Sequence, residues 1–146
     1  MEHTYDLSRF TAAHQRDYTC ALQEIRGGRK YSHWMWYIFP QLQGLGRSST
    51  SEYYGIRGKE EAAAFLADPY LGGNLREICQ VLLQLPECNP ANIFGYTDAM
   101  KLRSSMTLFQ CASREEPLFT QVLEKYFQGK PDCRTIRMLE NPGGEP

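Results

Sequence analysis

The sequence has no long apolar run, no C-x-x-C pair and no large excess of charge of either sign. Because a membrane-spanning helix needs about 20 consecutive apolar residues, the first absence argues against a membrane-embedded protein. The formal net charge of −1 gives no overall field that would recruit nucleic acid or an anionic membrane. The N-terminal segment has neither a basic start nor an apolar stretch, so we expect no secretory signal.

Catalytic and metal-binding patterns are also scarce. The sequence lacks G-x-S-x-G, H-E-x-x-H and paired-carboxylate patterns, so no motif names a reaction. Its five cysteines are an odd set without zinc-ligand spacing, and two of its three histidines lie near the N-terminus. These features predict reduced, buried thiols in a cytoplasmic protein, with no metal and no cofactor.

What is present favours one helical domain. A chain of 146 residues, of which 42% are hydrophobic, can build a single core. Apolar residues recur mostly at helical spacing, and no segment alternates with period two between hairpin turns. We therefore predict an all-α fold, a compact multihelical bundle over residues 1–140, followed by a disordered tail over residues 141–146.

Capping and breaking residues set the expected helix boundaries. N-caps are predicted at Asp6, Asp17, Ser32, Asp68, Asn89, Asp132 and either Thr97 or Asp98. Helices are expected over residues 7–14, 17–26, 32–39, 59–67, 70–85 and 97–111, near 118–127 and 133–139, with a short turn over 90–94. Segment 32–39 could also be a strand with alternate residues on one face. We favour a helix because the neighbouring segments are helical.

Two segments suggest a ligand site, and the first runs from Lys30 to Gln41. It contains both tryptophans and His33, and it leads into a glycine- and serine-rich loop over residues 44–51. Between Arg26 and Arg57 there are five basic residues and one acidic residue, a local net charge of +4. This charge favours an anionic partner such as a phosphate. It would equally arise if the basic residues capped helices and paired with acids elsewhere.

The second segment is the expected helix around Lys101. At about 100° per residue, Lys101, Ser104 and Ser105 fall on one stripe, which places a lysine and two hydroxyls within reach of each other. This pattern predicts a Lys–Ser catalytic pair or a ligand contact. Alternatively, both serines bond to the carbonyl four residues earlier and Lys101 extends to solvent.

Each remaining candidate also has two interpretations. His33 is either a general base, since histidine titrates near neutrality, or a core residue bonded to a backbone carbonyl. One of Trp34 and Trp36 is expected in the core, and the other, or Tyr54, against a planar ligand. Arg47 and the serines after it either hold a phosphate or belong to an ordinary surface loop.

Several of these motifs together resemble one protein family. They are Gly28-Arg-Lys-Tyr-Ser-His-Trp-Met-Trp-Tyr-Ile-Phe-Pro-Gln41, Gly44-Leu-Gly-Arg-Ser48, Pro69-Tyr-Leu-Gly72, Ile93-Phe-Gly95 and Met100-Lys-Leu-Arg-Ser-Ser-Met-Thr-Leu-Phe109. From about Asp6 to Leu139 the chain resembles the bacterial domain-of-unknown-function family 1810. Some members are mislabelled calpastatin, but calpastatin-type inhibitors resemble long disordered chains, whereas this composition builds a core. The resemblance implies a compact multihelical fold and no established activity.

We therefore expect a cleft that binds, and in one version hydrolyses, a small anionic ligand such as a nucleotide or an ADP-ribose derivative. The candidate ligand-binding residues are His33, Trp36, Gln41, Arg47, Ser48, Tyr54, Lys101, Ser104 and Ser105. His33 would be the base of any reaction, and whether the protein is an enzyme is left open. The chain also has a weaker, general similarity to the helical family that removes ADP-ribose from nucleobases, but the catalytic pattern of that family is absent from this sequence.

Two other functions stand beside this one. The first is a non-enzymatic protein-interaction module, in which the aromatic segment belongs to the core. The second, which the net charge disfavours, is binding of single-stranded nucleic acid. Convergence of His33, Arg47 and Lys101 on one hollow would favour the ligand site, and divergence would favour the interaction module.

Overall fold

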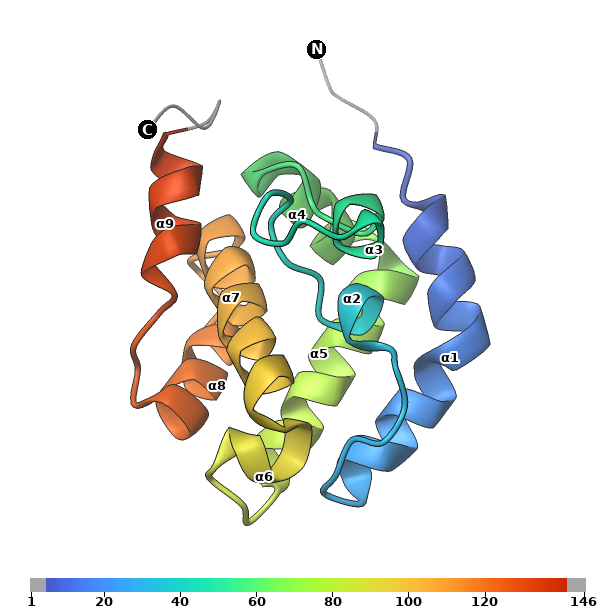
Figure 1. The fold of residues 1–146 in the computed structure, drawn as a ribbon, viewed down its shortest axis with the longest axis vertical. Helices are drawn as coiled ribbons and strands as arrows, with labels where there is room; N and C mark the ends of the chain where they lie inside the picture. The colour runs from blue at the N-terminus through green and yellow to red at the C-terminus, as the bar shows by residue number, and fades with distance from the viewer. Residues whose placement is uncertain (1–4, 142–146) are drawn as a thin grey trace.

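A computed structural model describes residues 5–141 and shows an all-helical fold there, which confirms the predicted class (Figure 1). The helices within these residues are α1 (Ser8–Arg26), α2 (Met35–Ile38), α3 (Ser49–Tyr53), α4 (Lys59–Ala67), α5 (Pro69–Gln84), α6 (Pro90–Phe94), α7 (Tyr96–Ala112), α8 (Leu118–Phe127) and α9 (Cys133–Glu140). The same residues contain no strand, and an isolated parallel bridge joins Leu42 to Ile56. Residues 142–146 of the predicted tail lie outside the described residues.

Two long helices, α5 and α7, organise the core. Helix α7 packs against α4, α6, α8 and α9, and α5 packs against α1, α4 and α8. In Figure 1, α1 and α9 lie on opposite sides of the molecule with α5 and α7 between them. The rings of Phe65, Phe109 and Phe119 are fully buried where these helices meet, so aromatic burial supplies a large part of the core.

The N-terminal helix corrects one prediction. The expected division before Asp17 is wrong, because α1 runs unbroken from Ser8 to Arg26. No proline or glycine separates the two halves, and an aspartate inside a helix costs at most about 0.7 kcal/mol. The Asp17 carboxylate also accepts hydrogen bonds from Arg16 and from the Tyr37 hydroxyl, which offset that cost.

The predicted helix over residues 32–39 is a single turn, Met35–Ile38. Ser32 does not cap it, because the amide and the hydroxyl of Ser32 both donate to Glu24 on α1. The turn ends at Phe39, before Pro40, as the restriction on a residue that precedes proline predicts. The choice of helix over strand is confirmed, and the expected length is wrong.

Most other boundaries agree with their capping signals. Helices α4 and α6 have their predicted ends, and Asp68 and Asp132 cap α5 and α9 by accepting from backbone amides. Helix α7 differs, because it begins after Gly95, whose φ is 79°. Neither Thr97 nor Asp98 is therefore its cap, and the Asp98 carboxylate binds lysines instead.

The chain between α2 and α4 forms a loop whose two ends are joined by backbone hydrogen bonds. We call this junction, between residues 41–43 and Ile56, the neck of the loop. The Gln43 amide donates to the Ile56 carbonyl at 2.7 Å, and the Ile56 amide donates to the Gln41 carbonyl at 2.9 Å. A Cβ atom on Gly55 would lie 2.7 Å from the Cα of Gln43, so glycine is required where the two sides approach. This loop contains α3 and one wall of the cleft described below.

The cysteines agree only in part with their prediction. Cys79 is buried, but Cys20, Cys88 and Cys133 are exposed, and Cys111 is intermediate. None of the five forms a disulfide within the described residues. The expectation of buried thiols is therefore wrong for the three exposed cysteines, which lie on the outer side of α1, in the α5–α6 connection and at the start of α9.

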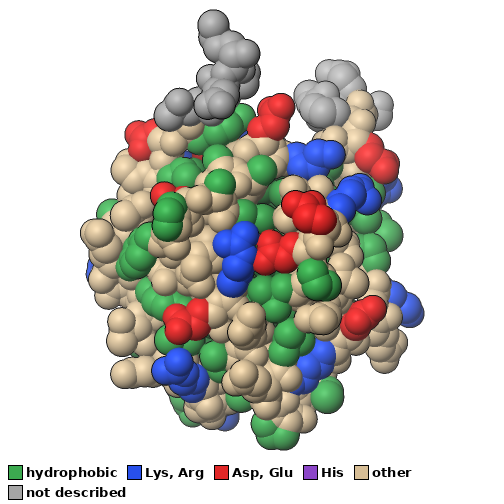
Figure 2. All heavy atoms as spheres, turned by 180° about the vertical axis from the view of Figure 1, so that it is seen from behind, with side chains coloured by type: hydrophobic (Ala, Val, Ile, Leu, Met, Phe, Trp, Pro, Cys, Tyr) green, Lys and Arg blue, Asp and Glu red, His purple; other side chains and the backbone are tan. Residues whose placement is uncertain are grey.

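Charge is dispersed over the face seen in Figure 2. Basic and acidic side chains are interspersed there, and no continuous patch of one sign covers the face. This distribution agrees with the formal net charge of −1. Over residues 5–141, no helix has both the length and the apolar character needed to cross a membrane.

A buried histidine joins α1 to two other segments. His14 is 1% exposed, and its Nε2 lies 2.8 Å from the Tyr37 carbonyl while its Nδ1 lies 3.1 Å from the Asn74 amide nitrogen. Because a carbonyl can only accept, Nε2 holds the proton and Nδ1 accepts from Asn74. Burial lowers the pKa of His14 to about 4, despite the hydrogen bond to Tyr37, so the ring is neutral at physiological pH.

We expect acid to destabilise the fold through His14. The unfolded chain takes up this proton near the ordinary pKa of 6.5, whereas the folded chain does so only near 4. The free energy of unfolding should therefore be highest above that ordinary value and fall by roughly 3 kcal/mol as the pH approaches the folded value. Urea unfolding across this interval measures the fall. It should largely disappear in His14→Gln, and an equal fall in both proteins would contradict the assignment.

Candidate functional site

A cleft of about 280 Å³ opens between three segments of the chain. Its walls come from α2 with the loop that follows, from the first turns of α7 and from the start of α9. Four of the predicted site residues line it, namely Trp36, Gln41, Lys101 and Ser104. Two charged residues outside the predicted set, Asp132 and Arg134, also line it.

Two contacts hold the ammonium group of Lys101 at the cleft. Its Nζ lies 3.1 Å from the carboxylate of Asp98, one turn earlier on α7, and 3.9 Å from the centroid of the Trp36 ring. The Lys101 side chain is 22% exposed, so it is partly desolvated and still reaches the cleft. A cation over a tryptophan face is a favourable pair, and the remaining N–H groups of the ammonium can donate to a ligand.

A second lysine–tryptophan pair uses the same carboxylate. The Nζ of Lys30 lies 2.9 Å from Asp98 and 4.9 Å from the centroid of the Trp34 ring, and its side chain is 8% exposed. Burial would raise the pKa of Asp98, but hydrogen bonds and charge from Lys30 and Lys101 outweigh this effect and lower it. Asp98 is therefore an ionised bridge between segment 30–36 and α7, and it neutralises part of the positive charge predicted around Lys30.

One carboxylate fixes the tryptophan segment to α1. Glu24 accepts hydrogen bonds from the Tyr31 amide at 2.8 Å, the Ser32 amide at 3.0 Å, the Ser32 hydroxyl at 2.5 Å and the Trp34 indole N–H at 2.9 Å. Burial would raise the pKa of Glu24, but these hydrogen bonds outweigh it and bring the pKa to about 2. Trp34 is thereby held in the core at 1% exposure, and Trp36 is the tryptophan that lines the cleft.

Ser104 connects α7 to the start of α9. Its hydroxyl oxygen lies 3.3 Å from the Met100 carbonyl and 3.1 Å from Oδ2 of Asp132. The bond to the carbonyl four residues earlier is the structural alternative predicted for this serine, and the contact with Asp132 adds a positioning role. Lys101 makes no hydrogen bond to Ser104 or to Ser105 in the described part of the chain. The geometry therefore contains no Lys–Ser nucleophile.

His33, Arg47 and Ser48 lie outside the cleft. His33 is exposed in the connection before α2, where its backbone carbonyl accepts from the Tyr37 hydroxyl at 3.2 Å. Arg47 and Ser48 are exposed on the loop, and the Ser48 side chain caps α3 by accepting from the Ser51 amide at 3.1 Å. Of the three residues whose convergence would favour a ligand site, only Lys101 reaches this hollow, so this criterion counts in favour of the interaction module. His33, the predicted base, does not lie beside Lys101 in the cleft.

Tyr54 and Ser105 belong to the packing of the molecule. The Tyr54 ring lies 5.0 Å from the Tyr37 ring and 4.8 Å from the Tyr53 ring, centroid to centroid. A hollow between Trp36 and Tyr54 measures about 10 Å³, which is room for a single water molecule and not for a nucleobase. Ser105 is fully buried, and its hydroxyl has no hydrogen-bond partner in the described structure.

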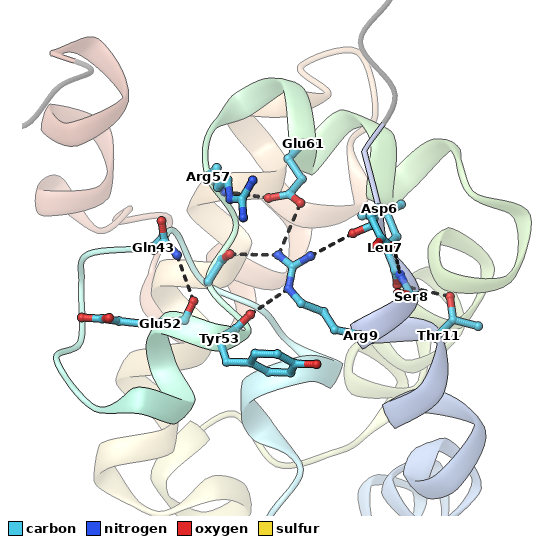
Figure 3. A network of polar contacts seen from close by, with 11 residues as sticks. Asp6, Leu7, Ser8, Arg9, Thr11, Gln43, Glu52, Tyr53, Arg57 and Glu61 are labelled. Carbon is cyan, nitrogen blue, oxygen red and sulfur yellow. Dashed lines mark hydrogen bonds and ion pairs between the residues drawn. The ribbon is translucent and has the colours of Figure 1, made fainter.

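A larger hollow of about 600 Å³ lies between α1, α3 and α4 (Figure 3). Arg9 crosses it, and its guanidinium donates to the carbonyls of Tyr53 at 2.7 Å, Gly55 at 3.0 Å and Asp6 at 3.1 Å and pairs with Glu61 at 3.3 Å. Because all its nitrogens are engaged, Arg9 acts as a clamp between these segments. Two arginines and three acidic residues line the hollow, so its net charge does not favour an anion.

The potential metal-binding side chains of residues 5–141 do not form a metal centre. Among the residues that the structure describes, no three histidine, cysteine, aspartate or glutamate side chains cluster in a way that could hold an ion. Asp132 and Asp98, the acidic groups in and behind the cleft, are bound to hydroxyls, amides and lysines.

With this geometry established, the comparisons with known proteins identify the family. Residues 4–139 match the family described as "Protein of unknown function (DUF1810)". The chain belongs to the DUF1810 family. This assignment confirms the resemblance seen in the tryptophan segment and in the Lys101 helix.

A solved crystal structure supports the fold. The crystal structure of a conserved hypothetical protein, Rv1873, from Mycobacterium tuberculosis is similar to this chain, with 43% sequence identity and a TM-score of 0.91. The similarity covers 93% of this chain and 97% of the mycobacterial one. No curated protein matches the chain.

We expect Glu24 to stabilise this DUF1810 protein in a pH-dependent manner. Its pKa changes from 4.5 to about 2 on folding, so its contribution is complete above the unfolded value and is lost as the pH falls toward the folded value. Glu24→Gln should lower the free energy of unfolding near neutral pH by about 1–3 kcal/mol. Tryptophan fluorescence during urea unfolding measures this loss. Glu124→Gln, an exposed change on α8, is the control, and an equal loss in both variants would refute the role of Glu24.

We expect the removal of the two adjacent serine hydroxyls to affect the free energy of unfolding differently. Ser104→Ala removes the contact with Asp132 and should reduce the free energy of unfolding by about 1 kcal/mol. Ser105→Ala removes a buried hydroxyl without a partner, so stability should be unchanged or rise by up to about 1 kcal/mol. Thermal and urea unfolding of the two variants, in parallel, provide the comparison. A greater loss in Ser105→Ala than in Ser104→Ala would show that the buried hydroxyl has an important partner.

Proposed function

We propose that the cleft lined by Trp36, Lys101 and Arg134 binds a small anionic ligand of the nucleotide or ADP-ribose class. The observation that supports this most directly is the position of Lys101, whose ammonium is fixed over Trp36 at 3.9 Å and lines the hollow. Because Asp98 and the indole ring already orient it, the cation needs little rearrangement to meet an anion. Arg134, from α9, brings a second positive charge to the same hollow.

The size of the cleft limits how much of such a ligand it holds. Pockets for drug-sized ligands measure roughly 300–1,000 Å³, and this one measures about 280 Å³. The cleft could therefore hold a phosphate with one attached sugar or ring. The rest of a larger nucleotide would extend into solvent. Stacking of a base between Trp36 and Tyr54 is not part of the proposal, since the hollow that they share measures about 10 Å³.

The proposal is for binding without an assigned reaction. His33, the candidate base, is exposed and does not line the cleft, and Lys101 bonds to Asp98 and not to a serine. The interaction module is the second candidate, supported by exposed tyrosines such as Tyr31 and Tyr96, each 73% exposed. A cytoplasmic location stays a prediction, because it is inferred only from the odd number of cysteines, which does not suggest a set of disulfides.

A thermal-shift and calorimetric screen tests the binding proposal. Phosphate, AMP, ADP-ribose and NAD are added to the full chain, and a ligand at about 100 times its Kd should raise stability by about 3 kcal/mol. Lys101→Ala should weaken binding about 10- to 100-fold, because a charge-assisted contact is lost. Arg137→Ala, which removes an exposed arginine of α9 outside the cleft, should leave binding unchanged.

The negative outcome of this screen is equally clear. If none of the four compounds stabilises the wild-type chain, the ligand proposal fails and the interaction module becomes the better explanation. If binding occurs but is unaffected by Lys101→Ala, the ligand site lies elsewhere.

A further inference from the structure

The Asp132 carboxylate has one engaged oxygen and one available oxygen. Oδ2 accepts from the Ser104 hydroxyl at 3.1 Å, the Thr135 amide at 3.1 Å and the Thr135 hydroxyl at 2.5 Å. These are all the side-chain hydrogen bonds of Asp132 in the described structure, and none of them uses Oδ1. Because both oxygens of a carboxylate accept hydrogen bonds, Oδ1 can accept a donor from a molecule in the cleft that Asp132 lines.

The cationic groups of the cleft do not neutralise this carboxylate. Lys101 pairs with Asp98, and neither Lys101 nor Arg134 forms an ion pair with Asp132 among the described residues. Arg134 uses its Nη1 on the Leu45 carbonyl at 3.3 Å, which leaves further N–H groups of the guanidinium available. The hollow therefore offers cationic donors and an anionic acceptor, held apart by the fold.

This arrangement selects among anionic ligands. An inorganic anion would be attracted by Lys101 and Arg134 but repelled by the adjacent carboxylate of Asp132. A ligand with hydroxyl groups beside its anionic group would turn the same carboxylate into a favourable partner. Acidic side chains hold ribose hydroxyls in this way in dinucleotide-binding folds.

We infer that the cleft recognises a sugar phosphate, with the phosphate between Lys101 and Arg134 and a sugar hydroxyl on Oδ1 of Asp132. This inference rests on the proposed function and names the part of the ligand that the cleft reads. Ser104 and Thr135 are positioning residues, because they fix the orientation of the Asp132 carboxylate. A volume of about 280 Å³ suits one sugar phosphate unit, either free or at the end of a nucleotide.

Calorimetric titration of the wild-type chain with three probes tests the inference. The probes are ribose 5-phosphate, inorganic phosphate and ribose. Ribose 5-phosphate should bind at least about 10-fold more tightly than inorganic phosphate, since a hydrogen bond to a charged group is gained. Ribose alone should not bind measurably, because it lacks the group that meets Lys101.

Asp132→Asn separates a ligand role from a structural role. Asparagine is as good an N-cap as aspartate, so α9 should keep its start and the circular dichroism spectrum should not change. The variant should bind ribose 5-phosphate about 10-fold more weakly and inorganic phosphate equally or more tightly, because repulsion is removed. A structural effect would weaken both probes together. Arg134→Ala should weaken both phosphates, with Arg137→Ala as the matched control.

The outcomes distinguish this inference from the proposal on which it rests. If ribose 5-phosphate and inorganic phosphate bind equally, and both depend on Lys101, the sugar contact is refuted and the anion site stands. If Asp132→Asn weakens both probes alike, the carboxylate is a structural group and the inference fails. If no probe binds the wild-type chain, the inference fails, and the proposed function then depends on the larger nucleotides of the earlier screen.

Discussion

The cleft depends on one carboxylate that binds two ammonium groups. Asp98 pairs with Lys30 at 2.9 Å and with Lys101 at 3.1 Å, and each lysine lies over a different tryptophan. Two stretches separated by about seventy residues of sequence are thereby joined at a partly buried point, where charged hydrogen bonds are stronger than at the surface. This bridge orients the Lys101 ammonium toward the cleft and ties segment 30–36 to α7.

Local signals predicted most of the fold. The alanine-rich Lys59–Ala67 helix, the turn after Asn89 and the caps at Asp68 and Asp132 all follow from propensity and capping, which act within a few residues. The errors arise where a distant partner changes a local preference. Ser32 resembles a cap, but its hydrogen bonds go to Glu24, which lies on a different helix.

The candidate site was less predictable, because it depends on which way side chains face. Trp36, Gln41, Lys101 and Ser104 line one cleft, and the other candidate residues do not. Asp132 was recognised only as a cap, since nothing local shows that its carboxylate meets Ser104, 28 residues earlier. His14 was overlooked for the same reason, because the burial and the Tyr37 and Asn74 contacts that make it a neutral link exist only in the folded chain.

The hydrogen-bonded neck between Gln41 and Ile56 allows the loop and the helical scaffold to differ in how much sequence change they tolerate. Its backbone bonds bring the chain back to where it left the helical scaffold, so exposed loop residues between these points, such as Arg47, can be exchanged with little effect on the helices. Leu45 and Gly46 lie inside this excursion and form part of the cleft wall. A change in the side chain at Leu45 would therefore alter the width of the cleft entrance while the helical core stays the same.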